Sequence, residues 1–438
     1  MGKNSFTPFA FQPLINQIIN QLRFSKPTDI QQEVIPAILE QESVIGQSHT
    51  GSGKTHAYLL PLFNQLDETK QEVQFVITSP TRELATQIYD DVKQMIQFAN
   101  KDNQWTAKLL VGGTDRKKMA AGLQTPPHIV VGTPGRILDL VLSGSLSIYS
   151  ASSFVIDEAD LMFELGFLKE VDQLLVRAKE DIQVLAFSAT IPTPLEHMLK
   201  KYMKQPLYVK IGDQITPETI EHRLIDLKHR EPSKLIVELS KVFQPYLAII
   251  FTNGQAEANE LAQSLQESGI NAGLIHGGLS PRERRRTLKH IEDLRYQYVV
   301  ATDLASRGID IKGVSHVINA QLPKEIDFYI HRVGRTARAG MEGMAISLFT
   351  EDDHSFIESL EEHGIPFIFS DVRNGEWIKA KRWNRRTIRR QTKNSQIDRE
   401  AWKRVKKPKR VKPGYRKKMK KQQQAVKRQL LKKRKKRR

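Results

Sequence analysis

The sequence predicts an α/β protein made of two tandem parallel-sheet domains and a basic C-terminal tail. Two series of short apolar runs, rich in Val, Ile and Phe, recur at intervals that suit strands alternating with helices. The runs do not alternate apolar and polar residues, as expected of parallel strands that are buried on both faces. A polar link separates the two series, and the composition becomes strongly basic near the C-terminus.

The charge of the chain is distributed unevenly. Its 438 residues carry a net charge of +19. Residues 371–438 hold 31 Lys and Arg against four acids, a net charge of +27, which leaves −8 for residues 1–370. We therefore expect a mildly acidic body with a basic tail.

Composition also excludes several classes of protein. The chain has no cysteine, which excludes disulfides and cysteine-ligated metal sites and suits a reducing cytoplasm. The first residues lack the pattern of a signal peptide, and no apolar stretch approaches the ~20 residues of a membrane span. We expect a cytoplasmic protein that does not act in a membrane.

The apolar runs divide the chain. Those of the first series cover 42–48, 73–82, 128–136, 153–160 and 184–190, and those of the second 246–253, 272–278, 296–303, 315–323 and 343–350. One large α/β domain is the alternative, but two series of about 150 residues each favour two domains. We expect domains at 1–210 and 220–370, a linker at 211–219 and the tail at 371–438.

The segment SHTGSGKT fits a phosphate-binding loop, in which a strand turns through glycines into a helix. Its backbone N–H groups would surround phosphate oxygens, Lys54 would reach the β- and γ-phosphates, and the Thr55 hydroxyl would ligate Mg²⁺. The alternative is a glycine-rich turn with a chance lysine. The expected ATP-binding residues of this loop are Ser48, His49, Thr50, Gly51, Ser52, Gly53, Lys54 and Thr55.

A second acidic signature follows the fourth run of the first series. Asp157 and Glu158 come where a strand should end, and a carboxylate there can hold Mg²⁺ through water while its neighbour orients the attacking water. We assign Asp157 to the metal and Glu158 to the water. Ligands bind outside the carboxyl ends of parallel strands, so this signature should meet the phosphate loop in space.

The tetrapeptide at 157–160, Asp-Glu-Ala-Asp, resembles the signature of the DEAD-box family of ATP-dependent RNA helicases. The resemblance covers nearly all of residues 1–370 and includes PTRELA (80–85), Gly112-Gly113, TPGR (133–136), SAT (188–190), ATDLASRGIDI (301–311) and HRVGRTARAG (331–340). It implies two RecA-like domains, ATP and Mg²⁺ as cofactors, and an RNA-dependent ATPase that unwinds short RNA duplexes or remodels ribonucleoproteins. The tail and details of the last motif resemble the bacterial cold-shock helicases of the CshB type.

The resemblance also assigns residues. Gln31 would read adenine, with Phe24 and Phe6 packing around it; a core Phe is the alternative for Phe24. Asp310 would lie near the ribose, and Arg335 and Arg338 would act as arginine fingers, with surface ion pairs as the alternative. Coupling residues would be Ser188, Thr190, His331 and Arg332. RNA contacts would come from Thr81, Arg82, Gly113, Thr133, Gly135 and Arg136 on one side and from Thr302 and Arg284 on the other.

Five positions depart from the family pattern: Arg23 and Ala337, where glycine is usual, and Ser48, Pro281 and Gln321. Pro281 stands where a glutamine often precedes Arg284, which weakens the RNA assignment of that helix. None of the five removes a charge that hydrolysis needs. We therefore expect an active ATPase.

The tail should be largely disordered, since it cannot bury enough apolar surface to fold alone. Trp377, Trp383 and Trp402 lie between its basic residues, which suits stacking on unpaired bases while lysines neutralise phosphates. A merely solvated tail, or a contact of Trp377 with the second domain, is the alternative. RNA is the expected partner, bound mainly through its backbone, and the chain is expected to be monomeric.

Two rival functions are alternatives to RNA unwinding for this sequence. An ATP-gated RNA clamp that does not unwind, and a DNA-directed remodeller, are the rival functions. Ribosomal and RNA-decay complexes are candidate partners. The RNA target is not indicated.

Overall fold

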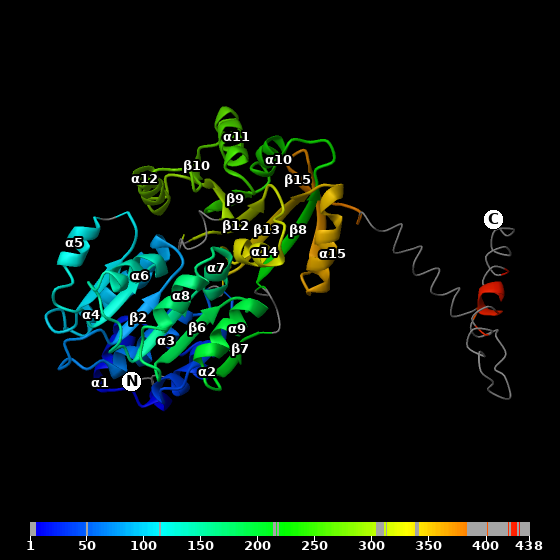
Figure 1. Cartoon of the computed structure of the whole chain (residues 1–438). Coiled ribbons are helices and arrows are strands. Elements are labelled where there is room, and N and C mark those ends of the chain that lie inside the picture. Colours follow the sequence, from blue (N-terminus) through cyan, green and yellow to red (C-terminus); the bar gives the residue numbers. More distant parts are fainter. Residues whose placement is uncertain are drawn as a thin grey trace. The chain divides into compact units, whose positions relative to one another are not determined.

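The computed structural model describes residues 6–49, 51–113, 115–212, 216, 219–303, 311, 313–337, 341–382, 401, 419, 422–426 and 429 (Figure 1). Two parallel-dominated sheets organise the chain, so the predicted α/β class with two tandem sheets is confirmed. We call each sheet with its helices a lobe. No helix in these ranges combines the length and the apolar character that crossing a bilayer requires.

The first lobe contains a seven-stranded sheet in the order β3-β4-β2-β5-β6-β1-β7, with every recorded pairing parallel. Its strands are β1 (Val44–Gln47), β2 (Phe75–Thr78), β3 (Ala107–Leu110), β4 (Ile129–Gly132), β5 (Ser153–Asp157), β6 (Gln183–Ser188) and β7 (Leu207–Lys210). All five predicted runs of the first series are strands. The two strands that were not predicted, β3 and β7, lie at the edges of the sheet.

Helices cover both faces of this sheet, because neighbouring strand residues point into different cores. Val44 packs into one buried cluster and Ile45 into the other. The first cluster takes residues from η1 (Thr7–Phe9), α1 (Pro13–Gln21), α2 (Asp29–Leu39), α3 (Lys54–Gln65) and α4 (Arg82–Phe98). The second takes residues from α5 (Arg116–Ala121), α6 (Pro134–Leu142), α7 (Ala159–Glu164), α8 (Leu168–Leu175) and α9 (Thr193–Tyr202).

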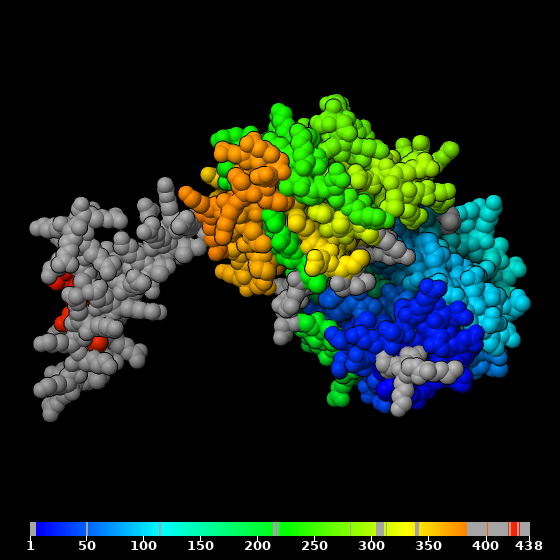
Figure 2. All heavy atoms as spheres, turned by 180° about the vertical axis from the view of Figure 1, so that it is seen from behind, coloured from blue at the N-terminus to red at the C-terminus, as the bar shows by residue number. Residues whose placement is uncertain are grey.

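The second lobe contains an eight-stranded sheet in the order β10-β11-β9-β12-β13-β8-β14-β15. Its strands are β8 (Ile220–Asp226), β9 (Ala248–Thr252), β10 (Ala272–Ile275), β11 (Tyr298–Thr302), β12 (His316–Asn319), β13 (Gly343–Phe349), β14 (Phe367–Arg373) and β15 (Glu376–Lys379). Its helices are α10 (Pro232–Leu239), α11 (Gln255–Glu267), α12 (Pro281–Glu292), α14 (Ile326–Val333), η3 (Glu351–Asp353) and α15 (His354–Glu362). Helix α12, yellow-green in Figure 2, stands at the surface.

The last two strands form a hairpin. Asn374 and Gly375 both have positive φ, 52° and 78°, as a two-residue type I′ turn requires. Regular structure therefore extends to Lys379, beyond the boundary predicted at 370. Most of the predicted tail, including Trp383 and Trp402, lies outside the described residues.

Two departures from the family pattern occupy left-handed backbone. Arg23 has φ 59° and Ala337 has φ 57°, and the family pattern has glycine at both positions. A residue with a Cβ pays roughly 1–2 kcal/mol for this conformation, which glycine adopts freely. Both positions therefore carry backbone strain that a glycine would not.

Candidate nucleotide and RNA site

The sheet order of the first lobe brings the predicted signatures together. Strands β5, β6 and β1 are neighbours and parallel, so the acidic signature, the SAT motif and the phosphate loop follow the same edge of the sheet. Strands β3, β4 and β2 form the adjoining part of that edge, and the candidate RNA residues follow them. The nucleotide and RNA candidates thus form two adjacent groups.

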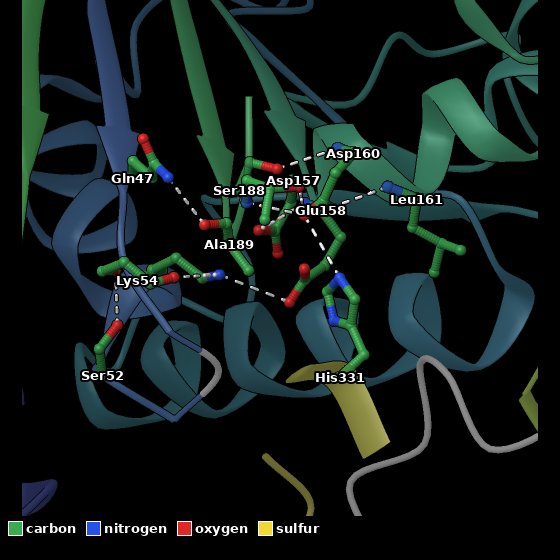
Figure 3. A network of polar contacts seen from close by, with 12 residues as sticks. Gln47, Ser52, Lys54, Asp157, Glu158, Asp160, Leu161, Ser188, Ala189 and His331 are labelled. Atoms are coloured by element: carbon green, nitrogen blue, oxygen red, sulfur yellow. Dashed lines mark hydrogen bonds and ion pairs between the residues drawn. The ribbon is translucent and has the colours of Figure 1, made fainter. Parts of the chain in front are cut away.

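The phosphate loop turns sharply into α3. Gly51 and Gly53 have φ of 82° and 92°, which only glycine adopts without strain. Lys54 begins the helix and is 6% exposed. Its Nζ donates to the Ser48 carbonyl at 3.1 Å and lies 3.7 Å from Glu158 Oε1 (Figure 3). The predicted lysine and carboxylate therefore meet.

The two carboxylates at the end of β5 are buried beside this lysine. Tyr58 donates its hydroxyl to Asp157 Oδ2 at 3.2 Å. Burial, with the negative charge of Glu158, raises the pKa of Asp157 to about 7, although Lys54 opposes the shift. Glu158 has φ 48°, and its Oε2 is buried without a hydrogen-bond partner in the described part of the chain. Such a pair favours a bound cation or water.

A magnesium ion fits this donor set. Oxygen ligands are the ones that Mg²⁺ prefers, and it is usually held by one or two carboxylates together with substrate phosphates and water. Among the described residues no group of three or more His, Cys, Asp or Glu could form an all-protein metal cage. Asp157 and the Thr55 hydroxyl, with a nucleotide, would supply the ligands that were predicted.

Three of the four predicted coupling residues meet at Asp160. Its Oδ2 accepts from the backbone N–H of Thr190 at 2.9 Å and lies 3.3 Å from His331 Nε2, while Ser188 Oγ accepts from the Asp160 N–H (Figure 3). Burial raises the pKa of Asp160, but His331, Lys54 and the Thr190 N–H together hold it below its ordinary value. The ionised carboxylate thus ties the SAT motif to α14.

The fourth coupling residue, Arg332, is buried in the second lobe and bonds to several polar groups there. Its guanidinium forms a two-point ion pair with Asp303 and donates to the Gln321 carbonyl at 2.6 Å and to Asn253 Oδ1 at 2.8 Å. These partners follow β11, β12 and β9, so Arg332 fixes the loops at the ends of three adjacent strands. Arg335, one turn along and also buried, donates Nε to the His331 carbonyl at 3.3 Å.

Two of the three candidate adenine residues contact the phosphate loop or the helix α3 that follows it. Gln31 Oε1 accepts from the Thr28 N–H at 3.0 Å, and its Nε2 donates to the Gly53 carbonyl at 3.1 Å. Phe24 packs edge-on against His56, whose pKa burial lowers to about 4. Phe6 is 1% exposed and belongs to the core. Gln31 therefore links the N-terminal segment directly to the loop.

The candidate RNA residues line loops that follow β2, β3 and β4. Arg82 begins α4, capped by the Thr81 hydroxyl, and its guanidinium lies against Gly112 and Gly113. Thr133 is the N-cap of α6, whose first turn holds Gly135 and Arg136; a Cβ at Gly135 would meet nothing within 4 Å. Since packing does not require glycine there, the backbone is open to a close neighbour.

The candidate RNA residues of the second lobe are Thr302 and Arg284. Thr302 ends β11 and is buried. Arg284 Nε forms an ion pair with Glu83 Oε1 at 2.8 Å, which joins α12 to α4.

Replacing Gly113 by Ala should weaken RNA binding more than a matched change. The new Cβ would lie 2.5 Å from Arg82 Nη1, so the guanidinium must move, and φ is 84°. Gly144→Ala is the control, because φ there is 70° and its Cβ would meet nothing within 4 Å. Both variants should lose about 1–2 kcal/mol of stability from backbone strain. Only Gly113→Ala should also raise the RNA concentration that half-stimulates the ATPase; an equal rise in both variants would contradict the assignment.

Some predicted residues lie outside the described ranges, and some partners were missed. Thr50, Asp310 and Arg338 are not described. Sequence reasoning overlooked the contacts of Tyr58 and Glu83. Glu83 stands within the PTRELA motif, so that motif held the signal, whereas nothing in the sequence marks Tyr58.

Comparisons with known proteins find matches to both lobes of this chain. Family models match for a DEAD/DEAH box helicase at residues 28–198 and for a helicase conserved C-terminal domain at residues 231–340. The chain is 50% identical over 420 residues to the DEAD-box ATP-dependent RNA helicase CshB of Bacillus subtilis, covering 96% of this chain and 95% of the relative. It is 46% identical to CshB of Bacillus cereus, with 96% of each covered.

A solved structure is similar to both lobes. Dbp5 of S. cerevisiae, bound to RNA and ADP BeF3, matches with a TM-score of 0.76 and 27% identity, over 84% of this chain and 95% of that one. The RecA-like fold implied by the sequence is confirmed by this likeness.

Proposed function

Because the chain belongs to the DEAD-box family of ATP-dependent RNA helicases, we propose that it hydrolyses ATP when RNA is bound and locally opens short RNA duplexes or remodels ribonucleoproteins. The observation that carries this proposal is the Asp-Glu-Ala-Asp motif, in which Glu158 lies 3.7 Å from Lys54 and Asp160 lies 3.3 Å from His331. It connects the phosphate loop of the first lobe to a helix of the second.

The phosphate loop and the acidic signature carry hydrolysis. Lys54 binds the β- and γ-phosphates together with the remaining loop residues, while Thr55 and, through water, Asp157 would hold Mg²⁺. When bound, the ion neutralises charge that develops on the transferred phosphate. Glu158 orients the attacking water, and its unpartnered buried Oε2 supports this role. To reach the phosphates, Lys54 would exchange its hydrogen bond to the Ser48 carbonyl for phosphate oxygens.

Nucleotide selection belongs to the N-terminal segment. Gln31 reads the adenine edge, with Phe24 and Phe6 packing around the base, and Asp310, which is outside the described residues, is proposed for the ribose. The Gln31 amide already forms hydrogen bonds with Thr28 and Gly53. Adenine must therefore either replace these bonds or use the remaining donor and acceptor positions of the same amide. Adenine binding would therefore alter the hydrogen bond between Gln31 and the phosphate loop.

RNA is held through its backbone by the candidate residues that follow β2, β3 and β4, together with Thr302 at the end of β11 and Arg284 on α12. Hydroxyls, backbone N–H groups and arginines contact phosphate and ribose without reading bases. Arg335 and Arg338 stabilise the transition state when the lobes close on RNA, and Ser188, Thr190, His331 and Arg332 couple closure to the nucleotide. We further propose that the chain works as a cytoplasmic monomer, with ribosomal or RNA-decay complexes as partners.

A strand-displacement assay tests unwinding against the rival functions. The full chain with ATP should release one strand of a short RNA duplex, and the non-hydrolysable analogue should not sustain repeated rounds. ATP-dependent RNA retention without strand release would favour the RNA clamp. Equal displacement of a DNA duplex would favour the DNA-directed remodeller.

The tail beyond the last strand should tether RNA. Residues 383–438 hold 27 Lys and Arg against two acids, a net charge of +25, and their removal leaves β14 and β15 intact. Truncation after Arg382 should weaken RNA binding and flatten its salt dependence, by roughly 0.7–0.9 in slope for each lost phosphate contact. ATP turnover without RNA should change little. An unchanged salt slope would contradict the tether.

A further inference from the structure

Helix α12 presents two different faces. At 100° per residue, Arg282, Arg285, Arg286 and Lys289 occupy positions i, i+3, i+4 and i+7 and share one face. Arg284 points the opposite way and pairs with Glu83. We call the four-residue side the outer face of α12.

The outer face is exposed and its charges are not neutralised locally. All four side chains are exposed, and within the described residues none forms an ion pair with an acid. Glu283 bonds the N–H and hydroxyl of Ser280 in a capping box instead, and Glu292, at i+3 from Lys289, forms no ion pair with the outer face in the described part of the chain. The four side chains line a hollow of about 490 Å³ at the surface of α12, yellow-green in Figure 2.

This arrangement opposes helix stability. Like charges at i, i+3 and i, i+4 repel, and Arg282 in the first turn faces the positive end of the helix dipole, whereas Lys289 in the last turn lies at the favourable end. The charge is also concentrated in a body that carries −8 over residues 1–370. A solvated face would be more stable with alternating signs, so a bound polyanion explains it better.

We propose that the outer face of α12 is a second RNA-binding surface, which holds phosphates of RNA that continues beyond the clamped strand. The inference rests on the RNA-directed function proposed above, and it adds a surface distinct from the side of α12 that carries Arg284. Arginine guanidinium groups suit phosphate oxygens, and four cations around one hollow match the backbone of a strand better than a single anion. Contact with the backbone would extend the grip without selecting sequence.

A charge-matched pair of variants tests this surface in the full chain. The test variant carries Arg282→Gln, Arg285→Gln, Arg286→Gln and Lys289→Gln, and glutamine keeps helix propensity high. The control carries Arg177→Gln, Lys179→Gln, Lys200→Gln and Lys204→Gln, an equal loss of charge on the first lobe. Fluorescence anisotropy with a non-hydrolysable ATP analogue would measure binding across a range of salt.

Three labelled RNAs separate the outcomes: a short single strand, that strand with a single-stranded extension, and that strand with a duplex arm. The test variant should keep the parent's affinity for the short strand and the ATPase stimulation it gives. On extended RNA it should lose about tenfold or more in affinity, and its salt slope should fall by about 2–3. A loss on both extensions identifies general backbone contact, and a loss on the duplex arm alone identifies the duplex.

Three results would contradict RNA binding by the outer face of α12. They are parental affinity and salt slope of the test variant on both extended RNAs, an equal loss of affinity for the short strand, or an equal loss of affinity in the control variant. A surface for an acidic protein would give the first of these. Failure of the proposed function is separate, because it would appear as a parent whose ATPase the short strand does not stimulate.

Discussion

Replacing Glu158 by Gln should reduce RNA-stimulated ATP turnover by about 10²–10⁴-fold, or roughly 3–5 kcal/mol in the barrier. The amide keeps the size of the side chain but lacks the carboxylate charge that orients the attacking water. ATP binding should persist, because Lys54 and the loop are unchanged and one negative charge near the phosphates is removed. The chain should then remain on RNA in the presence of ATP. Single-turnover hydrolysis and RNA dissociation rates would measure both effects.

The exposed Glu180 gives a matched control for the loss of charge. Glu180→Gln should turn over ATP as the parent does and release RNA at the parental rate. Rapid ATP turnover by Glu158→Gln, or fast RNA release from it with ATP present, would contradict the assignment of Glu158 to the attacking water.

Replacing Arg335 should give the second large loss. An arginine finger is typically worth 10³–10⁵ in rate, about 4–7 kcal/mol, whereas a surface ion pair usually contributes under ~1 kcal/mol. Arg335→Ala should therefore lower kcat for ATP by at least about 10³-fold while leaving the KM for ATP within a few-fold. Steady-state kinetics at saturating RNA would measure this split.

Arg335 is buried, so Arg335→Lys serves as a second variant that keeps the positive charge. It should fold like the parent and still lose most of its turnover, since lysine lacks the planar fork of donors. Arg295→Ala is the control, because Arg295 lies exposed in the same lobe and pairs only with Asp293 among the recorded ion pairs. If Arg335→Lys lost no more turnover than Arg295→Ala, Arg335 would have a structural role and not that of an arginine finger.

The strands that were predicted from the sequence are those buried on both faces. Continuous apolar runs of Val, Ile and Phe marked β1, β2, β4, β5 and β6 in the first lobe and β9 to β13 in the second. Their order in the sheet did not follow from the runs, since long-range pairing leaves no trace in a single segment. The convergence of Lys54 with Glu158 was predicted nonetheless, because ligand sites collect where parallel strands end.

The missed strands are half exposed. Strand β7 buries only Val209, and β8 alternates buried and partly exposed residues, with Arg223 between Leu224 and His222. Polar residues interrupt the apolar signal at such positions, although the backbone pairs just as well.

The contacts between side chains also could not be predicted from the sequence. Asp160 was visible as the last residue of its motif, but its role as the meeting point of Thr190 and His331 needs the geometry of two lobes. Gln31 was assigned to adenine by resemblance, and its bond to the Gly53 carbonyl was not foreseen. Contacts across long sequence separation depend on packing that no local pattern encodes.

The most direct test of the central claim is steady-state ATP turnover of the full chain without nucleic acid, with RNA, and with DNA of the same sequence. Turnover should be slow alone, rise strongly with RNA and rise far less with DNA, because RNA closes the lobes around the nucleotide. Turnover that is independent of RNA, or that DNA stimulates equally, would contradict an RNA-directed ATPase.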